Sequence, residues 1–175
     1  MTQRTPAPAR ASSAETQPVE LLSREPKGSF ANVLVPIDLS DTSERAIRWA
    51  LKQSTPKTKT IRVLMLCEDR DCDASDLVRF LSRFGEQPRA LMHGQLFSGD
   101  EDQLCAMIRE EGIDKIVVGV GDEPSSEGGA LAQRLARMCP CGVVMVPRRE
   151  PVRELVRTQG FTAPRGKPLE DSSPL

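Results

Sequence analysis

Three glycines and one aspartate are the residues of this sequence whose types and spacing could bind a nucleotide. A short apolar run ends in Gly119 and Gly121, and Gly129 follows ten residues after Gly119, where a helical pattern begins. Glycines let backbone N–H groups approach phosphates, and a helix N-terminus adds its positive dipole end. Asp38 ends an earlier apolar run and could accept a hydrogen bond from an adenine amine or a ribose hydroxyl. The pattern is typical of a loop that cradles phosphates.

A purely structural interpretation of the same residues stays open. Asp38 and Ser40 can cap the helix that follows them, and the glycines can simply make a turn. Taken alone, these residues favour the structural interpretation over the nucleotide site.

The elements that would position these residues are five apolar runs alternating with four helical patterns. Runs that are apolar throughout indicate strands buried on both faces, and therefore a parallel sheet with helices on both faces. The chain is thus predicted to be a doubly wound α/β domain, with capping boxes at Asp41–Glu44 and Ser98–Glu101. The predicted strands are 31–38, 60–68, 89–97, 114–121 and 141–147, and the predicted helices are 40–54, 73–85, 98–112 and 128–139.

Two tails flank this domain, which we place at residues 29–147. Residues 1–28 are rich in Pro, Ala, Ser and Gln without any apolar period, and residues 148–175 are similar, so both are predicted to be mostly disordered. Within the second tail, "VRELVR" could form one helical turn. A solvated tail is the stronger interpretation.

Charge and hydropathy exclude several classes of partner. The 24 basic residues nearly balance the 25 acidic ones, which gives no reason to expect nucleic acid or an anionic membrane. No apolar run approaches the roughly 20 residues that span a bilayer. The first residues lack the apolar core of a signal peptide, so we expect a cytoplasmic protein, with an organellar transit peptide as the alternative.

The cysteines and the single histidine offer little chemistry. Five cysteines are an odd number in an unsecreted chain, which argues against a disulfide framework. Cys139 and Cys141 form a C-x-C pair that could bind metal or cycle as a disulfide, but packing explains them better. His93 has no visible Ser or Cys partner. We therefore predict no catalytic residue, no metal site and no enzyme activity.

Two stretches resemble the opening and the closing of the universal stress protein family. "NVLVPIDLSDTSERAIRWAL" matches the family's Asp-x-Ser-x-x-Ser-x-x-Ala-x-x-x-Ala spacing at Asp38, Ser40, Ser43, Ala46 and Ala50. "IDKIVVGVG" with "GGALAQRLARMCPCGVVMVP" resembles the family's closing segment, so the similarity covers about residues 31–147. The resemblance implies five parallel strands in the order 3-2-1-4-5 and, often, a dimer.

The phosphate loop departs from the pattern of the family's nucleotide-binding members. Those members carry Gly, two residues, Gly, nine residues, and Gly followed by Ser or Thr. Here nine residues separate Gly119 from Gly129, where the pattern needs twelve, and Ala130 occupies the hydroxyl position. The loop also carries acidic side chains that repel a triphosphate, at Asp122, Glu123 and Glu127. Ser125 and Ser126 could replace the missing hydroxyl.

These observations predict a regulatory or interaction module of the universal stress type with weak or lost ATP binding. The first alternative is a working ATP or AMP binder with a degenerate site at Asp38, Gly119, Gly121, Ser125, Ser126 and Gly129. The second alternative is an enzyme of a related doubly wound superfamily. We also expect a homodimer, because the last strand is predicted to lie unprotected at a sheet edge. Its pairing residues would be Val143, Val144, Met145 and Val146.

Overall fold

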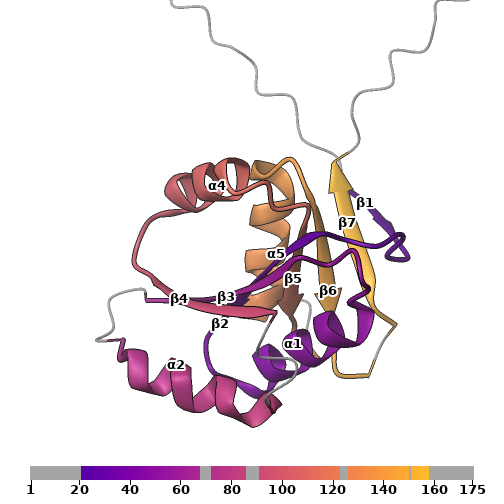
Figure 1. Ribbon diagram of the computed structural model, residues 1–175. Helices are drawn as coiled ribbons and strands as arrows, with labels where there is room; N and C mark the ends of the chain where they lie inside the picture. The colour runs from indigo at the N-terminus through magenta and orange to yellow at the C-terminus, as the bar shows by residue number, and fades with distance from the viewer. Residues whose placement is uncertain (1–20, 68–71, 86–90, 123–125, 150, 158–175) are drawn as a thin grey trace, which may run out of the picture.

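A seven-stranded mixed sheet forms the centre of the molecule (Figure 1). The computed structural model describes residues 21–67, 72–85, 91–122, 126–149 and 151–157. The strands are β1 Leu21–Arg24, β2 Asn32–Ile37, β3 Thr60–Leu66, β4 Met92–Phe97, β5 Lys115–Gly119, β6 Gly142–Val146 and β7 Arg153–Arg157. The helices are α1 Asp41–Gln53, α2 Ala74–Leu81, α4 Glu101–Glu110 and α5 Glu127–Met138, and a 3₁₀ turn, η1, covers Ser82–Phe84.

The five strands predicted from the sequence are all present and all parallel to one another. They run in the order β4-β3-β2-β5-β6 within the larger sheet. β2 pairs with β3 on one side and with β5 on the other, with Val33 opposite Lys115. This confirms the predicted order 3-2-1-4-5, in which the first and fourth strands are neighbours.

Apolar residues on both faces of each central strand produce two cores. Val33, Val35 and Ile37 of β2 belong to the core beneath α1 and α2. Leu34 of the same strand belongs to the core beneath α4 and α5. Figure 1 shows these two pairs of helices on opposite faces of the sheet, as predicted.

The helices begin close to where the sequence predicts, but with different caps. Ser40 is the N-cap of α1, and its side chain accepts from the backbone N–H of Ser43. In α4 the capping box joins Asp100 to Gln103 rather than Ser98 to Glu101. Several Ser, Asp and acidic residues near each start satisfy the same spacing rule, so the rule alone does not select the cap.

Two strands from outside the predicted domain enlarge the sheet, so the prediction of five parallel strands is incomplete. β7 pairs antiparallel with β6, with Val144 opposite Glu154. β1 pairs antiparallel with β7, with Leu22 opposite Val156. Residues 21–24 and 153–157 are therefore strands, and "VRELVR" is not a helical turn. The rest of both tails, 1–20 and 158–175, lies outside the described residues.

The cause of this difference is the apolar edge of β6. Its run Val143–Val146 carries no charge and no proline, and such an edge favours pairing with another strand. The chain supplies that strand itself, as β7. The prediction that Val143–Val146 lies at the edge of the sheet is therefore wrong, because β1 is the outermost strand on this side.

A buried carboxylate ties the two added strands to the sheet. Glu154 of β7 has no exposed surface, and its Oε2 lies 3.0 Å from the Nε of Arg24 on β1. Its Oε1 pairs with the Nζ of Lys115 on β5. A Cβ at Gly142 of β6 would collide with this carboxylate, so only glycine lets the side chain cross β6 to reach Lys115.

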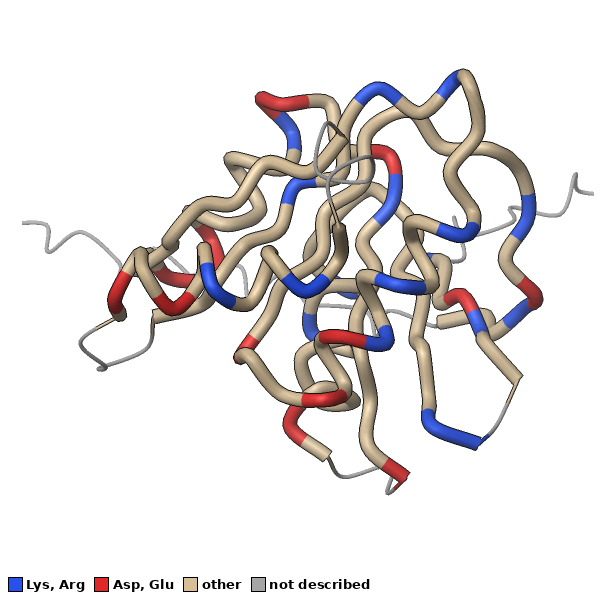
Figure 2. Tube along the Cα trace, turned by 60° about the horizontal axis from the view of Figure 1, so that its bottom comes forward, with Lys and Arg blue, Asp and Glu red and all other residues tan. Residues whose placement is uncertain are grey.

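Charge is mixed over the molecule. Figure 2 shows basic and acidic residues interspersed along the described trace. Within the part of the chain that the structure describes, no helix has the length and apolar character needed to cross a membrane.

Candidate functional site

Asp38 lies directly after β2 and accepts three hydrogen bonds on a single oxygen. Its Oδ1 accepts from the backbone N–H of Ser40 at 3.0 Å, from the Ser40 hydroxyl at 2.5 Å and from the Ser43 hydroxyl at 2.6 Å. Leu39 adopts a positive φ of 66°, which allows the tight turn between β2 and α1. No hydrogen-bond partner of Oδ2 is found among the described residues, and Asp38 lines the cleft described below.

The protonation of Asp38 follows from these contacts. Partial burial of the carboxylate raises its pKa, but the hydrogen bonds from Ser40 and Ser43 outweigh this effect. The pKa of Asp38 therefore lies below its ordinary value, and the residue is an anion at neutral pH. It can accept a hydrogen bond but cannot donate one.

Gly119 and Gly128 allow three backbone segments to meet at the end of β5. A Cβ at Gly119 would collide with the carbonyl oxygen of Thr42 in the first turn of α1. A Cβ at Gly128 would collide with the carbonyl oxygen of Gly119. The glycines thus serve close packing of β5 against α1 and α5. Gly128 was not among the predicted site residues, although its pairing with Gly129 in the sequence was a visible signal.

The Ser126 hydroxyl already accepts hydrogen bonds from two backbone N–H groups that a phosphate would need. It is the N-cap of α5, and its hydroxyl accepts from the backbone N–H of Gly129 at 3.3 Å. The same oxygen accepts from the backbone N–H of Gly121 at 3.1 Å. Two of the N–H groups expected to face phosphate are therefore already satisfied inside the protein.

A cleft of about 440 Å³ opens between the carboxyl ends of β2 and β5. It contains Asp38 and Gly119 from the predicted site. The other lining residues are Pro36, Ile37, Thr42, Ser43, Leu66, Val118, Glu127, Gly128, Ala130, Leu131 and Arg134. The position is the switch point of the strand order, where doubly wound sheets bind ligands.

The remaining predicted residues lie elsewhere. Gly121 and Gly129 line a second cavity of about 410 Å³, together with Arg149 and Arg153 from the segment around β7. Ser126 contacts this second group through its bonds to both glycines. Ser125 falls outside the described residues, as does Glu123. The predicted residues that line a cavity therefore divide between two, with Asp38 and Gly119 in the first and Gly121 and Gly129 in the second.

Charge in the first cleft is mixed. Glu127, in the first turn of α5, and Asp38 bring negative charge, and Arg134 of α5 brings positive charge. The Nε of Arg134 pairs with Glu101 Oε1 of α4 at 2.5 Å, and both side chains are partly exposed. Arg134 was not predicted as a site residue, because its helical spacing gave no sign that it reaches the cleft.

The sequence argued against a disulfide framework, and the structure nevertheless contains a disulfide, between Cys67 and Cys72. Cys139 faces Cys105, with the two sulfur atoms 2.6 Å apart, rather than Cys141. Among the described residues, no group of three or more His, Cys, Asp or Glu side chains is arranged to hold a metal ion.

The fold is that of a doubly wound α/β protein, with a cleft at the switch point of its strand order. The model of the universal stress protein family matches residues 29–147, so the chain belongs to that family. β1 and β7 lie outside the matched range. No curated protein sequence matches the chain.

Solved structures share the fold at low sequence identity. A universal stress protein in complex with cAMP is 20% identical, with a TM-score of 0.50 over 68% of this chain and 98% of that one. A hypothetical protein is 16% identical, with a TM-score of 0.51 over 69% and 97%. A universal stress protein from Archaeoglobus fulgidus is 18% identical, with a TM-score of 0.50 over 67% of this chain and 44% of its own.

Proposed function

We propose that this chain is a regulatory or interaction module of the universal stress type in which ATP binding is weak or lost. The observation that carries the proposal is the Ser126 hydroxyl, which accepts from the N–H groups of Gly121 and Gly129. A phosphate could use these donors only by displacing that hydroxyl, which would also remove the cap of α5.

Electrostatics supports the same conclusion. Asp38 and Glu127 line the cleft, and Arg134, the one basic residue among the described residues of its lining, already pairs with Glu101. A charge-assisted hydrogen bond contributes about 1.5–3 kcal/mol, so losing one or two weakens binding by about 10-fold to about 10⁴-fold.

Binding of AMP or another adenine nucleotide is the second candidate function. The cleft retains Asp38 and lies where this fold class places ligands. A structurally similar universal stress protein was solved with cAMP. A monophosphate is less negative than ATP and is therefore repelled less by Glu127. A nucleoside monophosphate is the better candidate ligand for a residual site.

As part of the same proposal, the protein works in the cytoplasm and is not an enzyme. The Ser43 hydroxyl does contact Asp38 in the described cleft, but this hydrogen bond holds the turn into α1. Homodimerisation through Val143–Val146 would require a second copy to displace β7, because β7 already pairs with β6 on that side.

Equilibrium titration of the full chain with ATP, AMP and cAMP tests the proposal when the variant Ser126→Gly is included. Glycine is almost as good an N-cap as serine, and the change frees both N–H donors. We expect weak ATP binding by the unmodified chain and equal or tighter binding by Ser126→Gly. Tight ATP binding that Ser126→Gly weakens would mean that the hydroxyl contacts phosphate, and the proposal would fail.

A further inference from the structure

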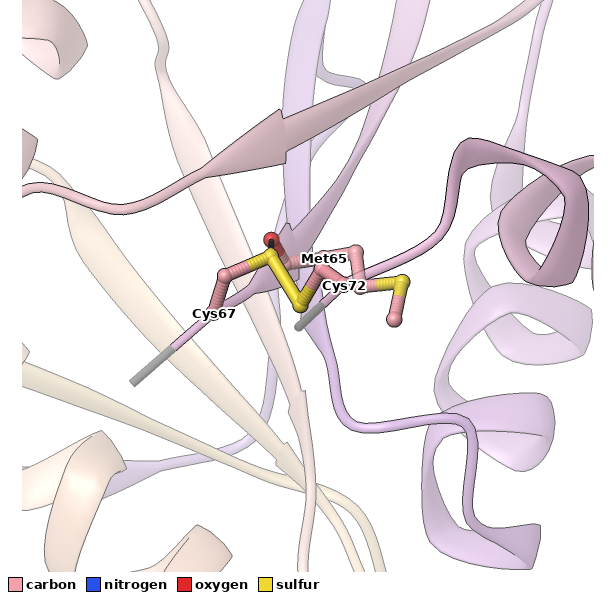
Figure 3. Close-up of a disulfide and its surroundings, with 3 residues drawn as sticks. All are labelled: Met65, Cys67 and Cys72. Atoms are coloured by element: carbon pink, nitrogen blue, oxygen red, sulfur yellow. Dashed lines mark hydrogen bonds between the residues drawn. A yellow bond between two sulfur atoms is a disulfide. The ribbon is translucent and has the colours of Figure 1, made fainter. Parts of the chain in front are cut away.

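A disulfide closes the connection between β3 and α2. Figure 3 shows the bond between Cys67 and Cys72 beside Met65 at the end of β3. The two cysteines are five positions apart, with Cα atoms 5.8 Å apart. Both are half-buried, so neither is enclosed in the core.

Both ends of this connection are held by the fold itself, independently of the sulfur bond. The backbone N–H of Cys67 donates to the carbonyl oxygen of Phe97 at 2.8 Å, which continues the pairing of β3 with β4. Cys72 directly precedes Asp73, whose side chain caps α2 by accepting from the N–H of Ser75 at 2.8 Å. The two sulfur atoms therefore stay near each other whether or not they are bonded.

The carbonyl oxygen of Met65 offers a partner to the reduced form. It lies 3.5 Å from the Sγ of Cys67. Only a thiol has a proton to donate in this contact, because a disulfide sulfur has none. The site thus accommodates the dithiol as well as the disulfide.

The other cysteines provide an internal contrast. Cys105 and Cys139 lie in the core beneath α4 and α5, exposed by only 2% and 0%. Burial is the main cause that raises the pKa of Cys139. Burial also raises the pKa of Cys141 to about 11. The thiolate is the reactive form of cysteine, so the raised pKa slows the reaction of Cys139 and Cys141, and burial keeps reagents from Cys105.

We propose that Cys67 and Cys72 are a redox-active dithiol–disulfide site that exchanges with low-molecular-weight thiols and their disulfides. A small thiolate attacks one sulfur of the Cys67–Cys72 bond and forms a mixed disulfide, while the other cysteine leaves as a thiolate and takes a proton from water. A second small thiolate attacks the small-molecule sulfur of the mixed disulfide, which forms the oxidised small disulfide and releases the remaining cysteine as a thiolate that takes a proton from water. Two small thiols thus supply the two electrons that reduce the protein.

Thiol–disulfide exchange at Cys67 and Cys72 changes the restraints on one helix, α2. The disulfide joins the N-terminal end of α2 to the end of β3, so its reduction removes one restraint on that end of the helix and leaves the Asp73 cap in place. Leu77 and Phe80 still hold α2 on the core, and the rest of the sheet is untouched. Reduction therefore loosens the first turn of α2 without unfolding the domain.

Thiol trapping across a redox gradient tests the proposal. The folded full chain is equilibrated with reduced and oxidised glutathione in stepwise ratios, alkylated rapidly, and analysed by peptide mass spectrometry. We expect alkylation of Cys67 and Cys72 to rise together with the reducing ratio and to fall when the ratio is reversed. Cys105 and Cys139 should stay unlabelled, and amide hydrogen exchange should speed up only around Ser75–Leu77.

Two variants sharpen the test. Cys72→Ser removes the resolving thiol, so Cys67 should retain glutathione as a mixed disulfide, detected as added mass. Cys141→Ser should leave the redox response of the 67–72 pair unchanged. The proposal is overturned if the pair is labelled only after unfolding, if it is labelled at every ratio, or if Cys105 and Cys139 respond in its place.

Discussion

Asp38 combines a structural role with a place in the cleft. Its Oδ1 holds the turn into α1 through Ser40 and Ser43, and the residue lines the cleft. The sequence left two interpretations of this residue, a helix-capping role and a ligand role. The cap of α1 is Ser40, which Asp38 holds in place, and the ligand role stays a prediction.

Asp38→Asn should lower the stability of the protein in a pH-dependent way. The pKa of Asp38 is lowered in the folded protein, so its contribution is present above its ordinary pKa of 3.8 and is lost as pH falls through the folded value. The difference in free energy of unfolding between wild type and variant should therefore shrink below about pH 4. Urea unfolding at stepped pH measures it. A difference that stays constant down to pH 3 would contradict the assignment.

Glu44→Gln is the matched control for that experiment. The pKa of Glu44 is also lowered, but chiefly by Arg48, which is partly exposed like Glu44 itself. Added salt screens exposed ion pairs more than hydrogen bonds to hydroxyls. Salt should reduce the effect of Glu44→Gln and leave that of Asp38→Asn nearly unchanged.

Gly119→Ala should destabilise the protein by about 1–3 kcal/mol, the cost of overpacking a close contact. The added methyl would collide with the carbonyl oxygen of Thr42, which cannot move without shifting α1. At Gly121 the nearest atom to a new Cβ is the side-chain Cβ of Ser126, 3.0 Å away, so Gly121→Ala should cost less. Urea unfolding compares the two. Equal losses would mean that the contact between β5 and α1 is not tight.

At the scale of elements, the central strands were predictable and the added strands were not. β2, β3 and β5 are apolar on both faces, and that pattern alone distinguishes a buried parallel strand. β7 contains Arg153, Glu154 and Arg157, so its composition resembles a solvated tail. Its burial depends on Lys115 and Gly142, which lie far away in the sequence.

Glu154→Gln should destabilise the pairing of β7 with β6. The change leaves Lys115, which is only 15% exposed, without its charged partner. Breaking a buried ion pair by removing one member costs about 3–5 kcal/mol. Thermal unfolding should show a large loss for Glu154→Gln, and hydrogen exchange should increase first in β1 and β7.

Arg24→Ala is the comparison for this prediction. Arg24 contacts the same carboxylate, but its side chain is 42% exposed. Exposed ion pairs contribute about 0.2–1 kcal/mol, so this loss should be small. If the two variants are equally destabilised, the buried carboxylate does not hold β7 through Lys115.

At the scale of the whole molecule, β7 determines whether β6 can pair with a second copy. Leu155→Pro removes a backbone donor from β7 opposite Val143 and should release this strand. We expect the unmodified chain to be monomeric at micromolar concentration and the variant to dimerise through β6. Light scattering coupled to size exclusion measures both. If the unmodified chain already dimerises while the amides of β7 stay protected from hydrogen exchange, the dimer must form through a surface other than β6.

The site was less predictable from the sequence than the fold was. The sequence spacing suggested that Gly119 and Gly121 line one phosphate site. In the structure the chain turns after β5, and the two residues line different cavities. Sequence spacing likewise could not show that the Ser126 hydroxyl bonds both glycine N–H groups. These contacts depend on side-chain direction, which a residue pattern does not specify.

Calorimetric titration of the full chain with ATP and magnesium tests the central claim most directly. With Gly121 and Gly129 bonded to Ser126, and with Glu127 in the cleft, the account predicts heats too small to fit, or a dissociation constant weaker than about 100 µM, which corresponds to about 5.5 kcal/mol. A dissociation constant in the low micromolar range or tighter, lost in Asp38→Ala, would contradict the account and establish the chain as an ATP-binding member of its family.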